Sequence, residues 1–251
     1  MDLDLADRVY VVTGGARGLG RATADVLVAE GARVVLSGRT GASLEAAREL
    51  LGEAVEPVAA DNADPGTPGL LIEAAQRRWG RLDGALVSVG GPPRGPVTAI
   101  TDEEWTAAFG SVFLGAVRIA RAIGTVLPSG GSLALVLSSS VRSPLADMAI
   151  SNGLRPGLAM VAKTLADELG PTGVRVNGLL PGRVETDRVA ELDDASPDPE
   201  ASRAASIASI PLRRYGEPEE FGRVAAFLLS PASSFVSGAM VPVDGGMLRA
   251  L

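Results

Sequence analysis

The stretch VYVVTGGARGLG, residues 9–20, decides how this chain folds. Its four apolar residues predict a buried strand, and a helical pattern follows from Ala22 to the region of Gly31. The glycines between them allow a tight turn and a close approach to a phosphate, and the helix N-terminus offers free N–H groups and a partial positive charge. We therefore predict a dinucleotide-binding turn; the alternative is an ordinary tight strand–helix turn. The predicted cofactor contacts here are Gly14, Arg17, Gly18, Leu19 and Gly20.

Short apolar runs alternate with helical patterns along the rest of the chain. Further strands are predicted at 33–36, 55–59, 84–89, 132–137, 174–180 and 240–243, and helices at 44–51, 70–79, 102–126, 157–169 and 219–229. This alternation predicts βαβ units and a parallel sheet covered by helices on both faces. No repeat, linker or low-complexity tract divides the chain. The expected fold is a single doubly wound, Rossmann-type α/β domain, residues 1–251, with about seven parallel strands.

Residues 188–211 interrupt this alternation. The segment is acidic, contains Pro197 and Pro199, and has few apolar residues before Ile207. A long irregular segment just after the carboxyl end of a strand is typical of a lid over a cleft. The alternative is a solvated surface insert. We expect a lid-like insert at about 188–211.

The absent residue types restrict the chemistry. The 251 residues include no cysteine and no histidine, which excludes thiolate nucleophiles, disulfides, Ser-His-Asp triads and metal sites built from thiolates or imidazoles. We expect no bound metal. Lys163 is the only lysine, and Tyr10 and Tyr215 are the only tyrosines. Tyr10 is expected to pack in the sheet and Lys163 to be structural, so neither is a candidate for catalysis.

The charge balance restricts the partners. The formal net charge is −7 at pH 7, which argues against binding to nucleic acid or to anionic membranes. The first ten residues carry three aspartates and no signal sequence, and no apolar stretch is judged long enough to span a membrane. We expect a soluble, cytoplasmic protein without nucleic-acid or membrane partners.

Several motifs together resemble the short-chain dehydrogenase/reductase (SDR) family, most of all its 3-oxoacyl-acyl-carrier-protein reductase branch, over essentially the whole chain. They lie at residues 13–20, 61–62 (DN), 174–177 (VRVN), 181–182 (PG), 214–220 (RYGEPEE) and 243–246 (VDGG). The resemblance implies a nicotinamide cofactor and assigns further residues to it. These are Asp61 and Asn62 at the adenine, Ser88 and Gly90 after the fourth strand, Pro181, Gly182 and Val184 at the nicotinamide, and Thr186 at its carboxamide.

The end of the second strand indicates which cofactor is preferred. An acidic residue there would bind the ribose 2′-hydroxyl and repel a 2′-phosphate. The sequence instead reads LSGR at 36–39, so Arg39 and the nearby Arg17 present two guanidinium groups that suit a phosphate dianion. We expect NADP(H) to be favoured over NAD(H); the alternative is that both arginines are merely solvated.

The family's catalytic Tyr and Lys are not matched. Counting back from Asn177 without gaps, the Tyr position holds Ser151 and the Lys position holds Arg155, while the family's catalytic Asn corresponds to Val112. A serine hydroxyl has no pKa near neutrality, and an arginine stays charged, so neither replaces a tyrosine as a proton donor.

The family's catalytic serine is matched by a run of three serines. Counting back thirteen residues from Ser151 gives Ser138, and with a small shift Ser139 or Ser140 takes its place. The candidate catalytic residues are therefore Ser138, Ser151 and Arg155.

A proline complicates the helix that should carry Ser151 and Arg155. Pro156 is tolerated in a first helical turn but disfavoured in a helix interior. This predicts a helix that begins near 153–156, with Asn152 or Gly153 as its cap. Ser151 and Arg155 would then not share one continuous helical face.

Two functions remain. The first is an atypical SDR-like oxidoreductase, NADP(H)-dependent, that reduces a small carbonyl compound or oxidises an alcohol with Ser151 and Arg155 in place of the usual pair. The second is a catalytically inactive nucleotide-binding pseudoenzyme that acts as a sensor or scaffold subunit. The resemblance also implies a homodimer or homotetramer formed through the helices at 102–126 and 157–169, whose small residues allow close packing. Arg142, Arg183 and Arg188 are loose candidates for docking a carrier protein.

Overall fold

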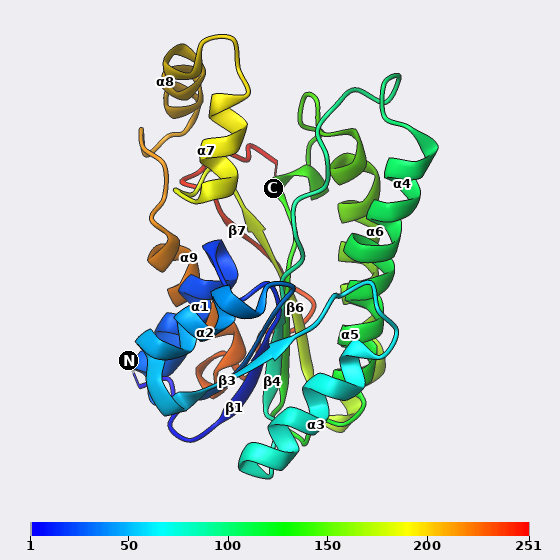
Figure 1. The fold of residues 1–251 in the computed structure, drawn as a ribbon, viewed down its shortest axis with the longest axis vertical. Coiled ribbons are helices and arrows are strands. Elements are labelled where there is room, and N and C mark those ends of the chain that lie inside the picture. Colours follow the sequence, from blue (N-terminus) through cyan, green and yellow to red (C-terminus); the bar gives the residue numbers. More distant parts are fainter. Residues whose placement is uncertain (1, 251) are drawn as a thin grey trace.

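A sheet of seven parallel strands forms the centre of the protein (Figure 1). The computed structural model describes residues 2–250; residues 1 and 251, the ends of the predicted domain, lie outside this range. The strand order is β3-β2-β1-β4-β5-β6-β7. The strands are β1 (Val9–Val12), β2 (Arg33–Gly38), β3 (Val55–Ala59), β4 (Gly84–Val87), β5 (Ser132–Val136), β6 (Arg175–Pro181) and β7 (Met240–Val243). The predicted doubly wound α/β fold is confirmed.

Helices cover both faces of the sheet (Figure 1). On one face, a buried apolar cluster joins the sheet to α1 (Gly18–Ala29), α2 (Gly41–Leu51) and α9 (Pro218–Leu229). On the other face, a second cluster joins it to α3 (Thr67–Trp79), α5 (Gly115–Gly124) and α6 (Ala149–Leu169). Strands β1, β4 and β5 are buried along their whole length, which explains why they read as continuous apolar runs rather than alternating ones.

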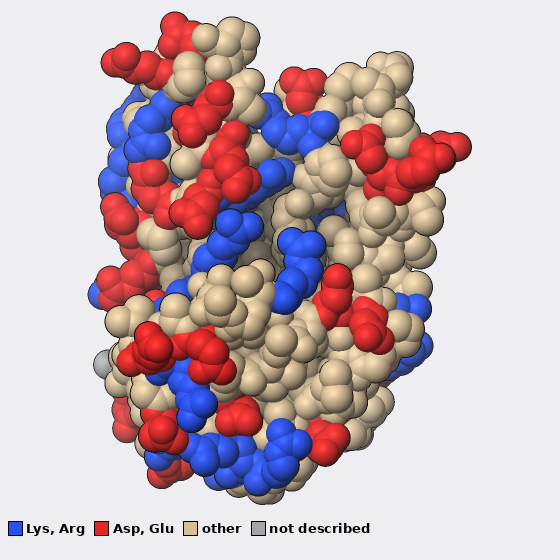
Figure 2. Space-filling model, viewed as in Figure 1, with Lys and Arg blue, Asp and Glu red and all other residues tan. Residues whose placement is uncertain are grey.

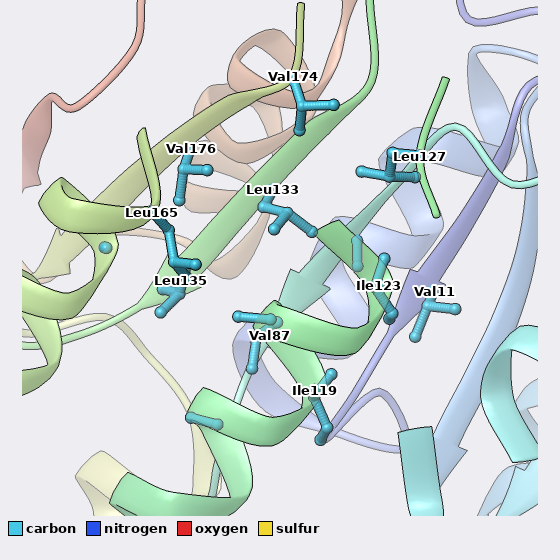
Figure 3. Packing of buried hydrophobic residues seen from close by; sticks show 14 of the residues in the cluster. Val11, Val87, Ile119, Ile123, Leu127, Leu133, Leu135, Leu165, Val174 and Val176 are labelled. Carbon is cyan, nitrogen blue, oxygen red and sulfur yellow. The ribbon is translucent and has the colours of Figure 1, made fainter. Parts of the chain in front are cut away.

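Figure 3 shows the second cluster at close range. Ile119 and Ile123 of α5 pack toward Val87 of β4 and Val11 of β1, and Leu165 of α6 lies against Leu135 of β5. Each of these side chains is at least nine-tenths buried, so each contributes about 1.5–3 kcal/mol of hydrophobic stabilisation. This packing fixes α5 and α6 on the sheet and thereby positions the residues at their ends.

The strand order reverses between β1 and β4. Strand β1 pairs with β2 on one side and with β4 on the other, so the chain connections leave it in opposite directions. A crevice therefore opens at the carboxyl ends of these two strands. The Thr13 hydroxyl bridges it at its base, donating to the Ser88 carbonyl oxygen at 2.7 Å and accepting from the Ser88 N–H at 2.9 Å.

The predicted helix over 102–126 contains an irregular middle. It begins as α4 (Asp102–Ala108) with a Thr101–Glu104 capping box, passes through a π-helical turn at Phe109–Leu114, and continues as α5. By length and composition, Asp102–Gly124 would suffice to cross a membrane. The expectation that no stretch meets this criterion was wrong. The apolar face of α5 packs against the sheet.

Most small residues on α4, α5 and α6 pack inside the chain. Ala108, Ala116 and Ala159 are buried, and a Cβ on Gly115 would lie 2.3 Å from the Asn62 carbonyl oxygen. These residues therefore contribute to the packing of the helices within the chain.

Helix α6 begins earlier than predicted and runs through Pro156 without a break. The expectation that Ser151 and Arg155 lie off one helical face was wrong. Two anchors hold the first turn: the Asn152 side chain pairs with both the N–H and the carbonyl oxygen of Leu145, and the Ala149 N–H donates to the Gly95 carbonyl oxygen. These tertiary contacts outweigh the helix-breaking tendency of the proline.

Replacing Pro156 with alanine is expected to stabilise the protein by about 1–2 kcal/mol, because alanine restores an N–H donor to the Asn152 carbonyl group and removes the ring clash. Denaturant unfolding measures the change in free energy. Pro218→Ala is the matched control: this proline occupies the first position of α9, where no helical N–H bond is lost. Equal effects of the two substitutions would contradict the interpretation.

Residues 188–211 are mostly helical rather than irregular, contrary to the sequence expectation. They fall in α7 (Asp187–Asp194) and α8 (Pro199–Ser209), which lie next to each other at the top of Figure 1. A polar cluster holds them, in which Tyr215 and Asp193 are buried and Arg203 and Glu185 are partly exposed. The Tyr215 hydroxyl donates to Asp193 at 3.0 Å, and Arg203 lies over the Tyr215 ring and pairs with Glu185. Pro197 lies between the two helices, and Pro199 is the first residue of α8. These two prolines led to the prediction of an irregular segment.

Candidate functional site

The glycine-rich turn joins β1 to α1 and packs too closely for side chains. Gly14 and Gly18 have φ of +59° and +58°, which favours glycine. A Cβ on Gly20 would lie 2.4 Å from the Gly14 carbonyl oxygen, and one on Gly15 would overlap Leu36. Helix α1 begins at Gly18 with no side-chain cap, so its first-turn N–H groups are open to an anion. This geometry fits a dinucleotide pyrophosphate.

The predicted adenine side lies at the ends of β2 and β3. Arg39 is exposed and makes no ion pair within the part of the chain that the structure describes. The Asn62 amide donates to the Ser88 carbonyl oxygen at 3.3 Å, and the Asp61 carbonyl oxygen accepts from Thr67. Asn62 and Ser88 are thus brought together, while Arg39 is free to meet a ligand.

The predicted nicotinamide side lies at the end of β6. Pro181 is its last residue, and a Cβ on Gly182 would meet Asp244 at 2.7 Å. Val184 is buried and forms a β-bridge with Gly216.

Thr186 links the nicotinamide side of the cleft to the glycine-rich turn. Its hydroxyl caps α7, and its methyl carbon would be 3.8 Å from a Cβ on Gly18. Arg17 reaches Asp187 at 3.9 Å, and both side chains are more than two-thirds exposed. Because such an exposed pair is weak, Arg17 is free to turn to a phosphate. Gly90 lies after β4 with open space at its Cβ position.

Three serines gather where β5 ends. The Ser140 and Ser151 hydroxyl oxygens are 3.1 Å apart and both are almost fully buried. Ser138 caps the short turn at Ser139–Val141 by accepting from the Ser140 N–H at 3.1 Å. The serine in contact with Ser151 is therefore Ser140, the alternative left open by the sequence, and not Ser138.

Arg155 lies one helical turn after Ser151, on the same face of α6. It is 5% exposed, and its Nη1 donates to the Val136 carbonyl oxygen of β5 at 2.6 Å. Its Nε is buried without a partner. Burial alone lowers the pKa of its guanidinium to about 10, so the group keeps its charge at neutral pH.

The tyrosines and the lysine lie elsewhere. Tyr10 is buried in β1 with its hydroxyl 3.4 Å from the Leu229 carbonyl oxygen, and burial raises its pKa above the ordinary value. The Tyr215 hydroxyl is held by Asp193. Lys163 donates to the Gly238 carbonyl oxygen at 3.0 Å. The prediction of a packed Tyr10 is confirmed, and Lys163 is tied to the main chain at Gly238.

Val112, at the family's Asn position, lies buried in the π-helical turn. Such turns are frequent at functional sites, but an isopropyl group offers no hydrogen bond. This turn carries no polar side chain to the cleft at that position.

Two arginines cross the mouth of the cleft; we name them the arginine strap. Arg188 of α7 donates to the Pro92 carbonyl oxygen at 2.8 Å, and Arg94, in the loop after β4, donates to the Leu192 carbonyl oxygen of α7 at 3.0 Å. Gly91 leaves room for the Arg188 guanidinium. Sequence reasoning missed Arg94, although its place in a glycine- and proline-rich loop after a strand's carboxyl end was a usable signal.

Basic side chains surround this cleft. Figure 2 shows a hollow near the middle of the face, with Lys and Arg side chains around it and acidic side chains directly beside them on its left. Arg142 reaches the Met240 carbonyl oxygen at 3.5 Å, and Arg183 pairs with the buried Asp193 at 3.4 Å. Over residues 2–250 the structure contains no cluster of acidic side chains that could hold a metal ion.

Comparisons with known proteins agree with this geometry. Residues 14–248 match the family model described as enoyl-(acyl carrier protein) reductase. An uncharacterised oxidoreductase of Mycobacterium tuberculosis is 37% identical over 249 residues, covering 96% of this chain and 91% of that protein.

Solved structures are similar over the whole length of this chain. L-sorbose reductase of Gluconobacter frateurii, in complex with NADPH and L-sorbose, is 29% identical with a TM-score of 0.91 and full coverage of both chains. A short-chain oxidoreductase of Pseudomonas aeruginosa, described as containing an atypical catalytic centre, is 31% identical with a TM-score of 0.90 and full coverage of both chains. The chain belongs to the short-chain dehydrogenase/reductase family of oxidoreductases.

Proposed function

We propose that this chain is an NADP(H)-dependent oxidoreductase that reduces a small carbonyl compound or oxidises the corresponding alcohol. The uncapped N-terminus of α1, opposite Thr186, is the observation that carries the proposal. Its open N–H groups and the glycine turn suit a pyrophosphate. The NADPH in the L-sorbose reductase structure supports a nicotinamide cofactor.

Each of the other site residues is assigned a role in binding the cofactor or the substrate. Arg39 and Arg17 would hold the 2′-phosphate, Asp61 and Asn62 the adenine, and Pro181, Gly182, Val184 and Thr186 the nicotinamide. When bound, the reduced nicotinamide supplies a hydride. Ser140 and Ser151 would donate hydrogen bonds to the substrate oxygen, and Arg155 would stabilise the negative charge that develops there. We assign Ser138 to the support of Ser140 rather than to the substrate.

The Arg39→Ala variant is expected to bind NADPH about 10- to 100-fold more weakly while NADH binding is unchanged, because a charge-assisted hydrogen bond to the 2′-phosphate is worth roughly 1.5–3 kcal/mol. Calorimetry with each cofactor measures the effect. Arg77→Ala, which removes an exposed arginine of α3, is the matched control. An equal loss for both cofactors, or no NADPH binding by the unmodified protein, would overturn the cofactor assignment.

The alternative is a nucleotide-binding sensor or scaffold subunit. One observation favours it: in the described part of the chain, Tyr10, Tyr215 and Lys163 are all tied to other partners. NADPH oxidation against a panel of ketones and β-ketoacyl compounds separates the two. Tight NADPH binding without turnover on any of them would favour the pseudoenzyme.

A homodimer or homotetramer and a cytoplasmic location are further parts of the proposal. Phe109 and Met160 are 45% and 68% exposed on the helices expected to form the interface, and an apolar outer face suits burial against a second copy. Light scattering after size exclusion gives the oligomeric state, and fluorescence microscopy of a tagged chain gives the location.

A further inference from the structure

The arginine strap carries positive charge that the protein itself does not neutralise. Most arginines of this chain form ion pairs with carboxylates. Arg94 instead donates through its Nη1 to the Leu192 carbonyl oxygen, and this is its single hydrogen bond within residues 2–250. A carbonyl oxygen fixes a guanidinium without cancelling its charge, and the other N–H donors of the side chain stay available. Arg94 is therefore held in place and able to bind an anion.

The contacts of Arg188 show which anion fits the strap. Its Nη2 donates to the Pro92 carbonyl oxygen at 2.8 Å, and its Nη1 lies 3.4 Å from a carboxylate oxygen of Glu191. Both side chains of this ion pair are more than a third exposed, so the pair is weak. A carboxylate matches the fork of a guanidinium, and a ligand carboxylate can displace that of Glu191. The strap is therefore suited to a carboxylate.

Arg94 lies beside the wall of the site that carries Ser151. The next residue, Gly95, is bound to the start of α6 in both directions: its N–H donates to the Asp147 carbonyl oxygen at 2.8 Å, and its carbonyl oxygen accepts from the Ala149 N–H at 3.2 Å. Ala149 precedes Ser151 by two residues, which span at most about 7 Å of chain. Arg94 is therefore anchored within the length of a small molecule from the proposed reaction centre.

Arg188 lies beside the cofactor side of the cleft. Thr186, two residues before it, caps α7, and its methyl carbon would be 3.8 Å from a Cβ on Gly18 of the glycine-rich turn. A Cβ on Gly91 would lie 2.7 Å from the Arg188 Nε, so the guanidinium rests against the loop after β4. The strap therefore spans the space between the proposed nicotinamide contact and the wall that carries Ser151.

The charge of the surrounding surface separates small anions from large acidic partners. The net charge is −7, yet Lys and Arg side chains surround the hollow in Figure 2, and acidic side chains lie over α7 and α4 to its left and right. These acidic residues include Asp187 and Glu191 on α7, and Asp102, Glu103 and Glu104 in the first turn of α4. A small anion reaches the arginines between the two helices, whereas a large acidic partner meets like charge on both.

We propose that the arginine strap binds the carboxylate of the substrate, and that this chain acts on free oxo acids and hydroxy acids rather than on carrier-bound acyl groups. This inference rests on the proposed function and adds the substrate class to it. The carbonyl or hydroxyl end of the substrate lies beside the nicotinamide and Ser151, and the carboxylate lies between Arg94 and Arg188. A thioester presents no carboxylate to the strap.

Straight-chain oxo acids, each beside its primary amide, test the strap in the whole protein. The series 4-oxopentanoate, 5-oxohexanoate and 6-oxoheptanoate varies the distance from carbonyl to carboxylate, and each amide keeps the shape of its acid without the charge. The kcat/KM with NADPH is expected to favour the acid by at least about tenfold at the best chain length, from one charge-assisted contact. Because the strap is partly exposed, this preference should fall at high salt concentration.

Variants assign the preference to the strap. Arg94→Gln and Arg188→Gln should each lower the ratio of acid to amide, and the double substitution should bring it to about one. Arg94→Lys keeps the charge without the fork and should retain part of the preference. Arg77→Gln is the matched control: it removes an exposed arginine of α3 with the same change in net charge, and the ratio should stay unchanged. Thermal unfolding of each variant shows that it folds.

Pentanoate binding tests the strap independently of turnover. Calorimetry with pentanoate and with pentanamide, in the presence and absence of NADP⁺, reports a carboxylate site even where no oxo acid is reduced. The acid is again expected to bind at least about tenfold more tightly, and the double substitution should remove the difference. If NADPH does not bind while this preference stands, the proposed function fails and the carboxylate site remains.

Three results would overturn the inference. The first is equal binding and equal kcat/KM for acid and amide. The second is a preference that survives the double substitution in a folded variant, or that falls equally in Arg77→Gln, since overall charge would then be its cause. The third is a higher kcat/KM for 4-oxopentanoyl-coenzyme A than for 4-oxopentanoate, which would show that the thioester and not the free acid is the substrate.

Discussion

Replacing Gly20 with alanine is expected to abolish nucleotide binding, with a loss of at least about 100-fold in affinity, and to lower the free energy of unfolding by about 2–3 kcal/mol. The new Cβ would lie 2.4 Å from the Gly14 carbonyl oxygen and 2.9 Å from its carbonyl carbon. Both are backbone atoms of the glycine turn, so the turn must move, and the N–H groups of α1 move with it. Calorimetry with NADPH and denaturant unfolding measure the two effects.

Gly69→Ala provides the matched control. Gly69 lies in α3 with nothing within 4 Å of its Cβ position, so the same added methyl group meets open space. Alanine also favours the helix, and we expect this variant to be more stable by up to about 1 kcal/mol with unchanged NADPH binding. If Gly20→Ala keeps its NADPH affinity, the glycine turn is not the pyrophosphate site.

The double substitution Ser151→Tyr with Arg155→Lys is expected to raise the reduction rate of unconjugated ketones by about 10²- to 10⁴-fold, the usual contribution of a positioned general acid. The tyrosine hydroxyl would stand near Ser140 and supply the proton that an alkoxide needs. A lysine one turn away would lower the pKa of that hydroxyl. Steady-state rates of NADPH oxidation with a simple ketone, taken across pH, measure the gain and reveal a new titrating group.

A phenylalanine version separates the hydroxyl from the ring. Ser151→Phe with Arg155→Lys fills the same space without a proton donor, so it should reduce simple ketones no faster than the unmodified protein. Equal rates for the tyrosine and phenylalanine variants would show that general acid catalysis is not what this site lacks.

Local sequence patterns were sufficient for the sheet but not for the helix that carries the candidate site. Strands β3 and β7 run over the predicted residues because short apolar runs bounded by turn residues leave little freedom. The predicted start of helix α6 was several residues too late, because the prediction treated Pro156 as a residue of the first turn. The helix starts where the Asn152 side chain pairs with Leu145 and the Ala149 N–H donates to the Gly95 carbonyl oxygen. Neither contact belongs to the helical periodicity of the sequence. Tertiary contacts of this kind cannot be read from propensity.

The sequence predicted which residues form the candidate site better than it predicted which of their side chains contact one another. Arg155 and Ser151 were placed at the centre, and the structure puts both on one face of α6. The sequence favoured Ser138, yet Ser140 contacts Ser151, since the turn after β5 rotates successive side chains in different directions. The helices of 188–211 were also missed. Contacts among Asp193, Tyr215 and Arg203, which lie in three separate segments, hold them together.

The arginine strap determines which positions beside the cleft can be substituted without loss of its contacts. Arg94 and Arg188 hold main-chain carbonyl oxygens, those of Leu192 and Pro92. Every residue type supplies the same acceptor, so the side chains at positions 92 and 192 are free to vary without loss of these contacts. Replacement of Arg94 or Arg188, in contrast, removes one of these two contacts. A library randomised at 92 and 192 should therefore retain folded members with altered substrate preference, which makes these two positions favourable starting points for engineering selectivity.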